Sequence, residues 1–467
     1  MERPITRRTM ARTTRRPSVR TYGANWGQRI FPAGDILAFV LGLSASFNMH
    51  IIGSVQVIEM LLPPTLLLLF AVHTRERLNP IQARVILLML LWLANQILTD
   101  MYRGTAFVDW VRGDAGIVFF GVNLVSLMLL LQKNERRKAI FIAAFALSML
   151  LQTKIQPSDQ SWDDPWKFGY GWGATILTVL VSCYFFHRRQ FVTAWIFVAG
   201  IIGVHLVENY RSMVLILLVM AALVMPIVPD QIGRLKILPR AGNSARVYVL
   251  AAFAMAAGGA AIGLVHFATS HGLISAGQEA KNRTELHSSL GPLLSGRPEI
   301  LVSSRAVLES PILGHGSWAK GYKYIEMLSD IEERNGIHTA LGYTEETSLG
   351  YIPTHSHLMG AWVSAGILGG VFWMYVLSLS VKGLMRVSVL RPPLAPVYAL
   401  FLVEFIWSIL FSPFGGSQRI ESALVIVILF DLLDQPAVVP EVVRSWMPSR
   451  KWRRASAWAD RSSPSQI

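Results

Sequence analysis

The sequence predicts an all-α polytopic membrane protein with about twelve transmembrane helices and one large extracytoplasmic loop that contains short helices. Three observations predict this fold class. Of the 467 residues, 52% are hydrophobic and only 15% are charged. Several stretches of about 20 residues carry almost no charge, which is the length of helix that crosses a bilayer. Basic residues recur in alternate segments between these stretches, as they do in the cytoplasmic loops of membrane proteins.

The net charge of +14 is concentrated at the two ends of the chain. Residues 1–29 hold eight arginines against Glu2, and residues 435–467 hold six basic residues against Glu441 and Asp460. We therefore expect two basic cytoplasmic tails, residues 1–30 and 435–467, in contact with membrane lipids. Because the placement of the charge follows the predicted topology, we expect no nucleic-acid partner. The N-terminal tail has no apolar core typical of a cleavable signal peptide.

Residues 31–266 contain the first nine predicted spans, and residues 357–434 contain the last three. Small residues in the ninth span, Ala256 to Gly263, allow neighbouring helices to approach closely in lipid. The single cysteine, Cys183, excludes a disulfide within the chain. The predicted limits of the spans are 31–50, 53–72, 81–99, 112–131, 139–151, 171–186, 191–207, 212–229, 247–266, 357–381, 394–412 and 418–434.

Loop charge orients the spans. With the N-terminal tail in the cytoplasm, the inside loops carry the basic groups Arg75 and Arg77, Lys133 to Lys138, Arg188 and Arg189, Arg234 to Arg246, and Lys382 to Arg391. The outside loops carry aspartates, among them Asp100, Asp109 and Asp164. This alternation predicts that both termini lie inside and that the large loop, residues 267–356, lies outside.

Three residues on the predicted outer side precede or begin helices and are candidates for chemistry. Arg211 opens the eighth span, Arg297 precedes Pro298, and His355 follows Pro353-Thr354 at the start of the tenth span. Helix N-termini offer free N–H groups and a partial positive charge that suit phosphate, and an arginine adds a forked grip. A neutral histidine in such a place can act as a base. Arg211 could instead anchor a helix at the interface, and Arg297 could be a solvated loop residue.

Two further histidines are accessory candidates. His357 lies two residues after His355, and together they could form an H-x-H zinc pair with His315, His338 or Glu345. No spacing among these residues matches a known zinc site, so we expect no metal. His315, between two glycines, is more typical of a turn than of a catalyst.

Three carboxylates, Glu59, Glu404 and Glu421, fall within predicted spans. Intramembrane carboxylates are candidates for function, and they could also be structural partners of Arg84 or of polar groups on other helices. We favour the structural interpretation.

Several of these residues occur in a familiar order. Gly296-Arg297, the turn from Pro311 to Gly316, and His355-Ser356 followed by Gly366 and Gly369 resemble the shared domain of the bacterial O-antigen ligase and O-antigen polymerase family. That family shows a Gly-Arg, a Pro-x-x-Gly-x-Gly turn, and a His followed by Asn, Ser or Gln before an apolar helix with Glu-x-Gly-x-x-Gly.

The resemblance extends over about residues 195–435, and Arg211 falls where the family carries another arginine. Two features depart from the family. Ser364-Ala365 stands where the family has the glutamate, and His357 is an additional histidine. The register from Gly366 favours His355 over His357 as the matching residue.

The resemblance implies a metal-independent glycosyltransferase in the bacterial inner membrane that uses no cofactor. Such enzymes move a glycan from an undecaprenyl-diphosphate-linked oligosaccharide to the hydroxyl of an acceptor glycan or lipid-linked repeat. Arg211 and Arg297 would bind the diphosphate, and His355 would be the base, with His357 and His315 as accessory candidates. Polymerase and ligase remain equally open. The alternative from another class is a transporter or flippase of lipid-linked sugars, which would depend on intramembrane charges such as Glu59 or Glu404 and not on His355.

Overall fold

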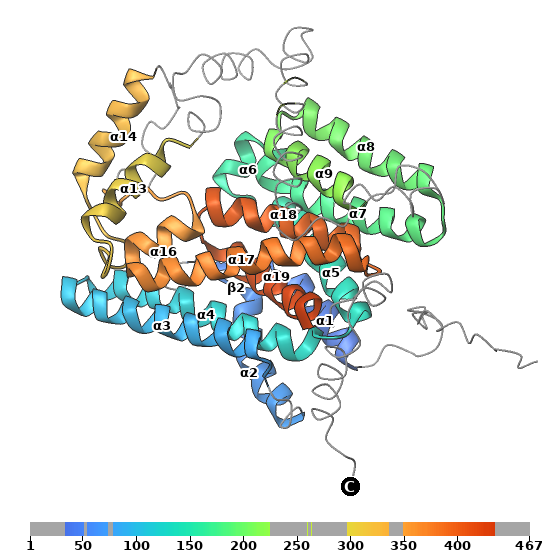
Figure 1. The fold of residues 1–467 in the computed structure, drawn as a ribbon, viewed down its shortest axis with the longest axis horizontal. Helices are drawn as coiled ribbons and strands as arrows, with labels where there is room; N and C mark the ends of the chain where they lie inside the picture. The colour runs from blue at the N-terminus through green and yellow to red at the C-terminus, as the bar shows by residue number, and fades with distance from the viewer. Residues whose placement is uncertain are drawn as a thin grey trace, which may run out of the picture.

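The computed structural model describes residues 33–50, 54–72, 78–224, 259, 263, 297–335 and 349–434. These residues are mostly helical and form the bundle of Figure 1. Both basic tails lie outside the described residues, as does the predicted ninth span apart from Gly259 and Gly263. The large loop is described only in residues 297–335 and 349–356.

The N-terminal elements are α1 (Ala33–Ser44), β1 (Asn48–His50), β2 (Ser54–Gln56), α2 (Val57–Val72), α3 (Pro80–Arg103), α4 (Phe107–Leu131), α5 (Glu135–Ile155), α6 (Asp159–Asp163), the π-helix η1 (Trp166–Tyr170), α7 (Gly171–His187), α8 (Phe191–Val207) and α9 (Arg211–Val224). The later elements are α13 (Glu299–Glu309), α14 (Tyr322–Arg334), α16 (His357–Ala365), α17 (Ile367–Leu390), α18 (Ala395–Phe411) and α19 (Gly416–Asp434).

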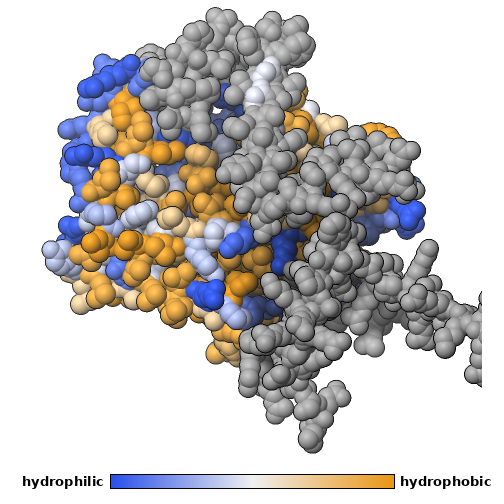
Figure 2. All heavy atoms as spheres, in the orientation of Figure 1, coloured by the Kyte–Doolittle hydropathy of each residue, from blue (hydrophilic) through white to orange (hydrophobic). Residues whose placement is uncertain are grey.

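The membrane class predicted from the sequence is supported by the lengths of the helices. Five helical segments in the described part of the chain are long and apolar enough to cross a membrane, namely Pro80–Arg103, Phe107–Leu131, Glu135–Ile155, Trp166–His187 and Ile367–Leu390. Figure 2 shows hydrophobic atoms over α3, where Leu87, Leu90 and Leu98 are exposed, and hydrophilic atoms over α14. The twelve-span count remains a prediction.

Local signals explain where the helices begin and end. Asn79 caps α3 by accepting hydrogen bonds from the backbone of Ile81 and Gln82, Pro80 occupies the first turn, and Gly104 ends the helix in the left-handed conformation. α5 begins at Glu135, four residues before the predicted fifth span. The predicted span begins later than the helix because Arg136, Arg137 and Lys138 are basic residues typical of a cytoplasmic loop.

The charges at the start of α5 are neutralised by other helices. Lys138 is fully buried, and its Nζ lies 2.7 Å from Asp431 of α19 and 2.6 Å from Glu135. Arg136 and Arg137 both contact Asp35 of α1, at 3.1 and 3.3 Å. A helix can therefore carry three basic residues in its first two turns at a packed end of the bundle.

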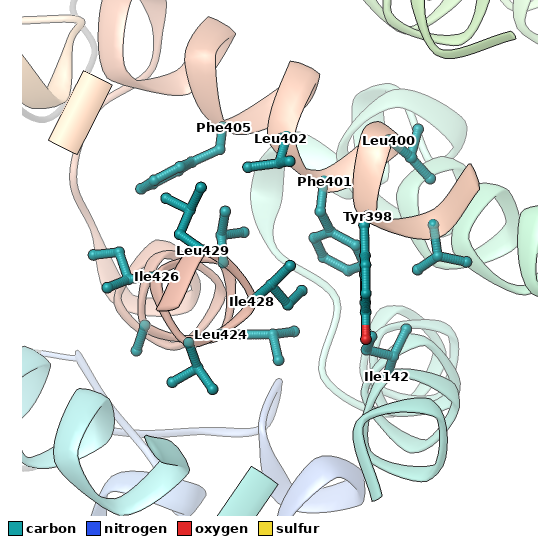
Figure 3. Packing of buried hydrophobic residues seen from close by; sticks show 14 of the residues in the cluster. Ile142, Tyr398, Leu400, Phe401, Leu402, Phe405, Leu424, Ile426, Ile428 and Leu429 are labelled. Carbon is teal, nitrogen blue, oxygen red and sulfur yellow. The ribbon is translucent and has the colours of Figure 1, made fainter. Parts of the chain in front are cut away.

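α18 and α19 form the centre of the core. Nearly every residue of α19 from Arg419 to Leu432 is buried, which is typical of a helix surrounded by others. Figure 3 shows side chains of the two helices, among them Phe405 and Leu429, packed together, with Tyr398 above Ile142 of α5. The C-terminal end of α18 also holds the segment that begins α16, through hydrogen bonds from Ser356 and His357.

The predicted tenth span is not one helix. Gly366, with φ +66°, separates α16 from α17, and the predicted turn from Pro311 to Gly316 packs into the break. The His315 amide donates to Val363 O at 2.7 Å, and the Ile367 amide donates to Ile312 O at 3.1 Å. Hydropathy alone cannot reveal such a break, because the residues on both sides of Gly366 are apolar.

The contact between the turn at Pro311–Gly316 and the break between α16 and α17 requires a glycine in each of the two segments. A Cβ on Gly366 would lie 2.0 Å from Ile312 O, and a Cβ on Gly314 would lie 2.6 Å from Gly366 N. The turn is also tied to α3, because Asp100 Oδ1 accepts from the Ser317 amide at 2.6 Å and Asp100 Oδ2 accepts from its hydroxyl at 2.6 Å. The two glycine motifs identified in the sequence therefore form one structural unit.

Gly366→Ala is expected to destabilise the protein more than Gly104→Ala. Both glycines have φ near +65°, but a Cβ on Gly104 has nothing within 4 Å. Gly104→Ala should cost only the left-handed backbone term, about 1–2 kcal/mol. Gly366→Ala adds the overlap with Ile312 O in a backbone region that only glycine occupies readily, about 1–3 kcal/mol more. Thermal unfolding of both variants in detergent measures the difference, and equal losses would contradict the close packing.

Candidate functional site

The loop that carries His355 is fixed by the two residues that follow it. Ser356 caps α16, since its hydroxyl accepts from the Met359 amide at 3.1 Å and donates to Ile409 O at 2.8 Å. His357 Nδ1 donates to Ser412 O at 2.6 Å. Both acceptor carbonyls lie at the C-terminal end of α18. The backbone of His355 is thus anchored to the most deeply packed part of the core.

His355 itself is half-buried and neutral at physiological pH. Burial is the main cause that lowers the pKa of its imidazole to about 4, and the positive charges of Arg297 and Lys167 lower it further. The imidazole therefore retains a free lone pair over the whole range from weakly acidic to basic pH, which is what a general base needs.

Arg297 lies at the centre of this region. Its charge acts on His355, on Glu299 in the first turn of α13, and on Tyr210 just before α9. α13 packs against α16, the helix that follows His355. Three segments that are far apart in the sequence are therefore within electrostatic range of one guanidinium group, and two of them carry the candidate residues Arg297 and His355.

Arg211 is related to this region by the residue that precedes it, Tyr210. It is the first residue of α9, and Tyr210 precedes it. Burial raises the pKa of the Tyr210 hydroxyl, and the charges of Glu404, Glu421 and Asp164 raise it further, while Arg297 opposes them. Tyr210, the residue before α9, therefore lies within electrostatic range of Arg297.

Lys167 is a third cation of the site and was not predicted from the sequence. It lies in η1, whose geometry is fixed by Trp166 Nε1 donating to His205 Nδ1 at 3.0 Å and by the Lys167 amide donating to Asp164 Oδ1 at 2.9 Å. His205 is fully buried and also contacts Thr175 Oγ1 at 2.7 Å. π-helical turns are frequent at functional sites. The signal available in the sequence was a lysine in a predicted outer loop otherwise rich in aspartate.

His357 lies in the aromatic core of the bundle. It is completely buried, and its ring packs against Trp373, Phe414 and Phe405 at centroid distances of 4.9, 5.2 and 6.5 Å. Because a carbonyl oxygen only accepts, the bond to Ser412 O fixes the proton on Nδ1. The structure therefore favours His355 over His357 for contact with a ligand, and His357 for holding the loop.

His315 also has a structural position. Its Nε2 lies 2.8 Å from Ala306 O of α13, and its ring meets Tyr324 of α14 edge-on at 5.8 Å. It joins α13 and α14 to the glycine turn. The other members of the zinc alternative, His338 and Glu345, lie outside the described residues. Within the described ranges, no three His, Cys, Asp or Glu side chains are grouped so that they could hold a metal ion.

The intramembrane carboxylates have partners. Arg419 of α19 donates to both oxygens of Glu59 at 2.6 Å from Nε and from Nη2, so the partner of Glu59 is Arg419 and not Arg84. The Ser408 hydroxyl donates to Glu404 Oε1, and Trp172 Nε1 donates to Glu421 Oε2 at 3.2 Å. Glu59 is therefore a structural residue, while the Glu404–Glu421 pair lies near Tyr210, on the core side of the site.

A hollow of about 370 Å³ lies between α3 and α4, lined by Ile97, Phe107, Trp110, Val111, Asp114 and neighbouring apolar side chains. None of the candidate site residues lines it.

No protein-family model matches the chain, and no curated protein is similar to it.

Proposed function

We propose that the protein is a membrane glycosyltransferase of the O-antigen ligase or polymerase type, which moves a glycan from an undecaprenyl-diphosphate carrier to the hydroxyl of an acceptor sugar. The observation that carries the proposal is the grouping of a neutral, half-buried His355 with Arg297 and Lys167. A diphosphate leaving group needs fixed cations, and an acceptor hydroxyl needs a base beside it.

The proposed reaction is a single displacement. The acceptor oxygen attacks the anomeric carbon of the donor sugar, and the bond from that carbon to the diphosphate oxygen breaks. Arg297, Arg211 and Lys167 stabilise the charge that develops on the diphosphate. His355 takes the proton of the acceptor hydroxyl. Undecaprenyl diphosphate and the extended glycan are the products, so no metal ion or other cofactor is required by this scheme.

Donor binding would also activate the base. In the free protein, Arg297 and Lys167 hold the pKa of His355 down, together with burial. A bound diphosphate brings negative charge between these cations and the imidazole, which favours the protonated ring. The pKa of His355 should therefore rise when the donor binds, and the imidazole should become a stronger base only in the presence of its substrate.

In the cell, we expect the site to face away from the cytoplasm at the inner membrane of a bacterium, with both termini inside. The basis is the alternation of loop charge in the sequence. The polyprenyl tail would then remain in the outer leaflet while the diphosphate reaches Arg297.

The alternative, a transporter of lipid-linked sugars, draws on one observation. Glu404 and Glu421 are both buried, on the adjoining helices α18 and α19. Intramembrane carboxylates occur in proton relays and transport pathways. The alternative predicts a donor that crosses the bilayer intact and leaves His355 without a role.

The proposed function is tested with purified protein in detergent, an undecaprenyl-diphosphate-linked oligosaccharide and an acceptor glycan. We expect a transferred glycan and free undecaprenyl diphosphate, at an unchanged rate after a chelator is added. Arg305→Lys serves as the control variant, because Arg305 lies in α13 with its side chain 60% exposed and bound to Glu309. A donor recovered intact from active preparations, with no product, would contradict the proposal.

A further inference from the structure

Glu299 has a carboxylate oxygen that the fold leaves without a partner. The residue opens α13, two positions after Arg297. Its Oε2 atom is buried, and no hydrogen-bond donor of the described residues reaches it. Burial raises the pKa of the Glu299 carboxyl, and the residue's own backbone amide and the charge of Arg297 oppose this rise, but neither supplies a donor to Oε2. The other acidic residue of the same helix, Glu309, differs in that Lys323 and Tyr324 both donate to it.

An arrangement of this kind is costly for the empty protein. A buried acceptor without a donor loses its hydrogen bonds to water and gains none in return. The negative charge near the N-terminus of α13 recovers part of the cost through the helix dipole, but it does not supply a donor for Oε2. Each unsatisfied buried group in a native protein therefore calls for an explanation, and a functional role is one of them.

The position of Glu299 indicates which part of a ligand this would be. In the proposed function, Arg297 binds the diphosphate of the donor. The first sugar of the donor is bonded directly to that diphosphate, so its O–H or N–H groups lie within a few ångströms of the phosphate oxygens. We infer that a carboxylate two residues from Arg297, at the start of the same helix, would lie nearer to this sugar than to the polyprenyl tail.

We propose that Glu299 is a binding residue for the donor sugar, and that its Oε2 accepts a hydrogen bond from an O–H or N–H group of the sugar attached to the diphosphate. The inference rests on the proposed function. It assigns Arg297 and Glu299 complementary tasks, the first for the leaving group and the second for the sugar that is transferred. Glu299 would then contribute to substrate specificity. A sugar with an O–H or N–H group at the right ring position would satisfy the carboxylate, and a sugar without such a group would leave it unpaired.

Kinetics of Glu299→Gln and Glu299→Met in the purified protein test the inference. Glu299→Gln keeps the shape and an acceptor but loses the charge, and Glu299→Met removes the acceptor. We expect kcat/KM for the donor to fall about tenfold in the glutamine variant and about 10- to 100-fold in the methionine variant, the range for a hydrogen bond to a charged group. KM for the acceptor glycan should remain unchanged. The unfolding temperature without substrate should be equal to that of the wild type or higher, since a buried, unpartnered carboxylate is removed.

Glu309→Gln is the matched control on the same helix. It removes contacts to Lys323 and Tyr324, so it should lower the unfolding temperature and leave donor kinetics unchanged. A purely structural Glu299 would behave in the same way, with a lower unfolding temperature and normal kinetics, and that result would overturn the inference. So would a rise of the acceptor KM alone. If the wild type neither binds nor cleaves the donor, the proposed function itself fails, and the inference falls with it.

Discussion

His355→Ala is expected to abolish detectable glycan transfer while the protein remains folded in the membrane. The loop that carries His355 is held by Ser356 and His357, so removal of the imidazole leaves the backbone in place. Loss of a positioned base usually lowers the rate by about 10²–10⁴. The measurement is the initial rate of transfer with purified protein at saturating donor, alongside its unfolding temperature.

The pH dependence of the wild-type rate is a second test of His355 as the base. The imidazole is a base only when neutral, and its pKa in the free protein is about 4. Hence kcat/KM for the donor should be lost as the pH falls through about 4. Because the bound diphosphate should raise the pKa of His355, the acid limb of kcat should lie at a higher pH than that of kcat/KM.

His357→Ala is the control for the choice of histidine. The substitution empties a buried site beside Trp373 and Phe414, so it should lower the unfolding temperature, at a cost of about 2–5 kcal/mol. Transfer per folded molecule should fall less than in His355→Ala. Near-normal transfer by His355→Ala together with an inactive but folded His357→Ala would show that His357 is the base.

Arg297→Lys and Arg211→Lys are each expected to lose most of the activity although the charge is kept. A lysine is a point charge on a flexible stem and cannot reproduce the forked contact of a guanidinium with two phosphate oxygens. The loss should appear mainly in kcat/KM for the donor. Arg305→Lys, on the exposed face of α13, should retain wild-type kinetics. Full activity of Arg297→Lys in normally folded protein would remove this residue from the diphosphate site and favour a solvated role.

Much of the helical framework could be predicted from the sequence because its signals are local. The cap at Asn79-Pro80, the long apolar run that follows it and the glycine at position 104 lie within one stretch of chain and are enough to define α3. The sequence also marks the candidates Arg297 and His355 by prolines near helix starts, with Pro298 directly after Arg297 and Pro353 two residues before His355.

The pairings across the bundle could not be predicted. Glu59 and Arg419 are 360 positions apart, and nothing in either neighbourhood identifies the partner. The break at Gly366 is hidden because apolar residues continue through it, and its cause is the distant turn at Ile312. The sequence left His315 and His357 as accessory candidates, and in the structure His315 contacts Ala306 O while His357 contacts Ser412 O and the aromatic core. Lys167 carries no motif, so only the fold shows that its charge acts on His355. Glu299 lies two residues after Arg297 in the sequence, but only the fold shows that its Oε2 is buried without a partner.

The fate of the bond between glycan and diphosphate tests the central claim most directly. Wild-type protein and His355→Ala are reconstituted separately in liposomes that contain the undecaprenyl-diphosphate-linked donor, with acceptor glycan in the buffer. Free undecaprenyl diphosphate and transferred glycan are then counted. We predict one carrier diphosphate released for each glycan transferred by the wild type, and close to none of either with His355→Ala. Movement of intact donor between the leaflets by both proteins, without release of carrier diphosphate, would contradict the account and identify a transporter.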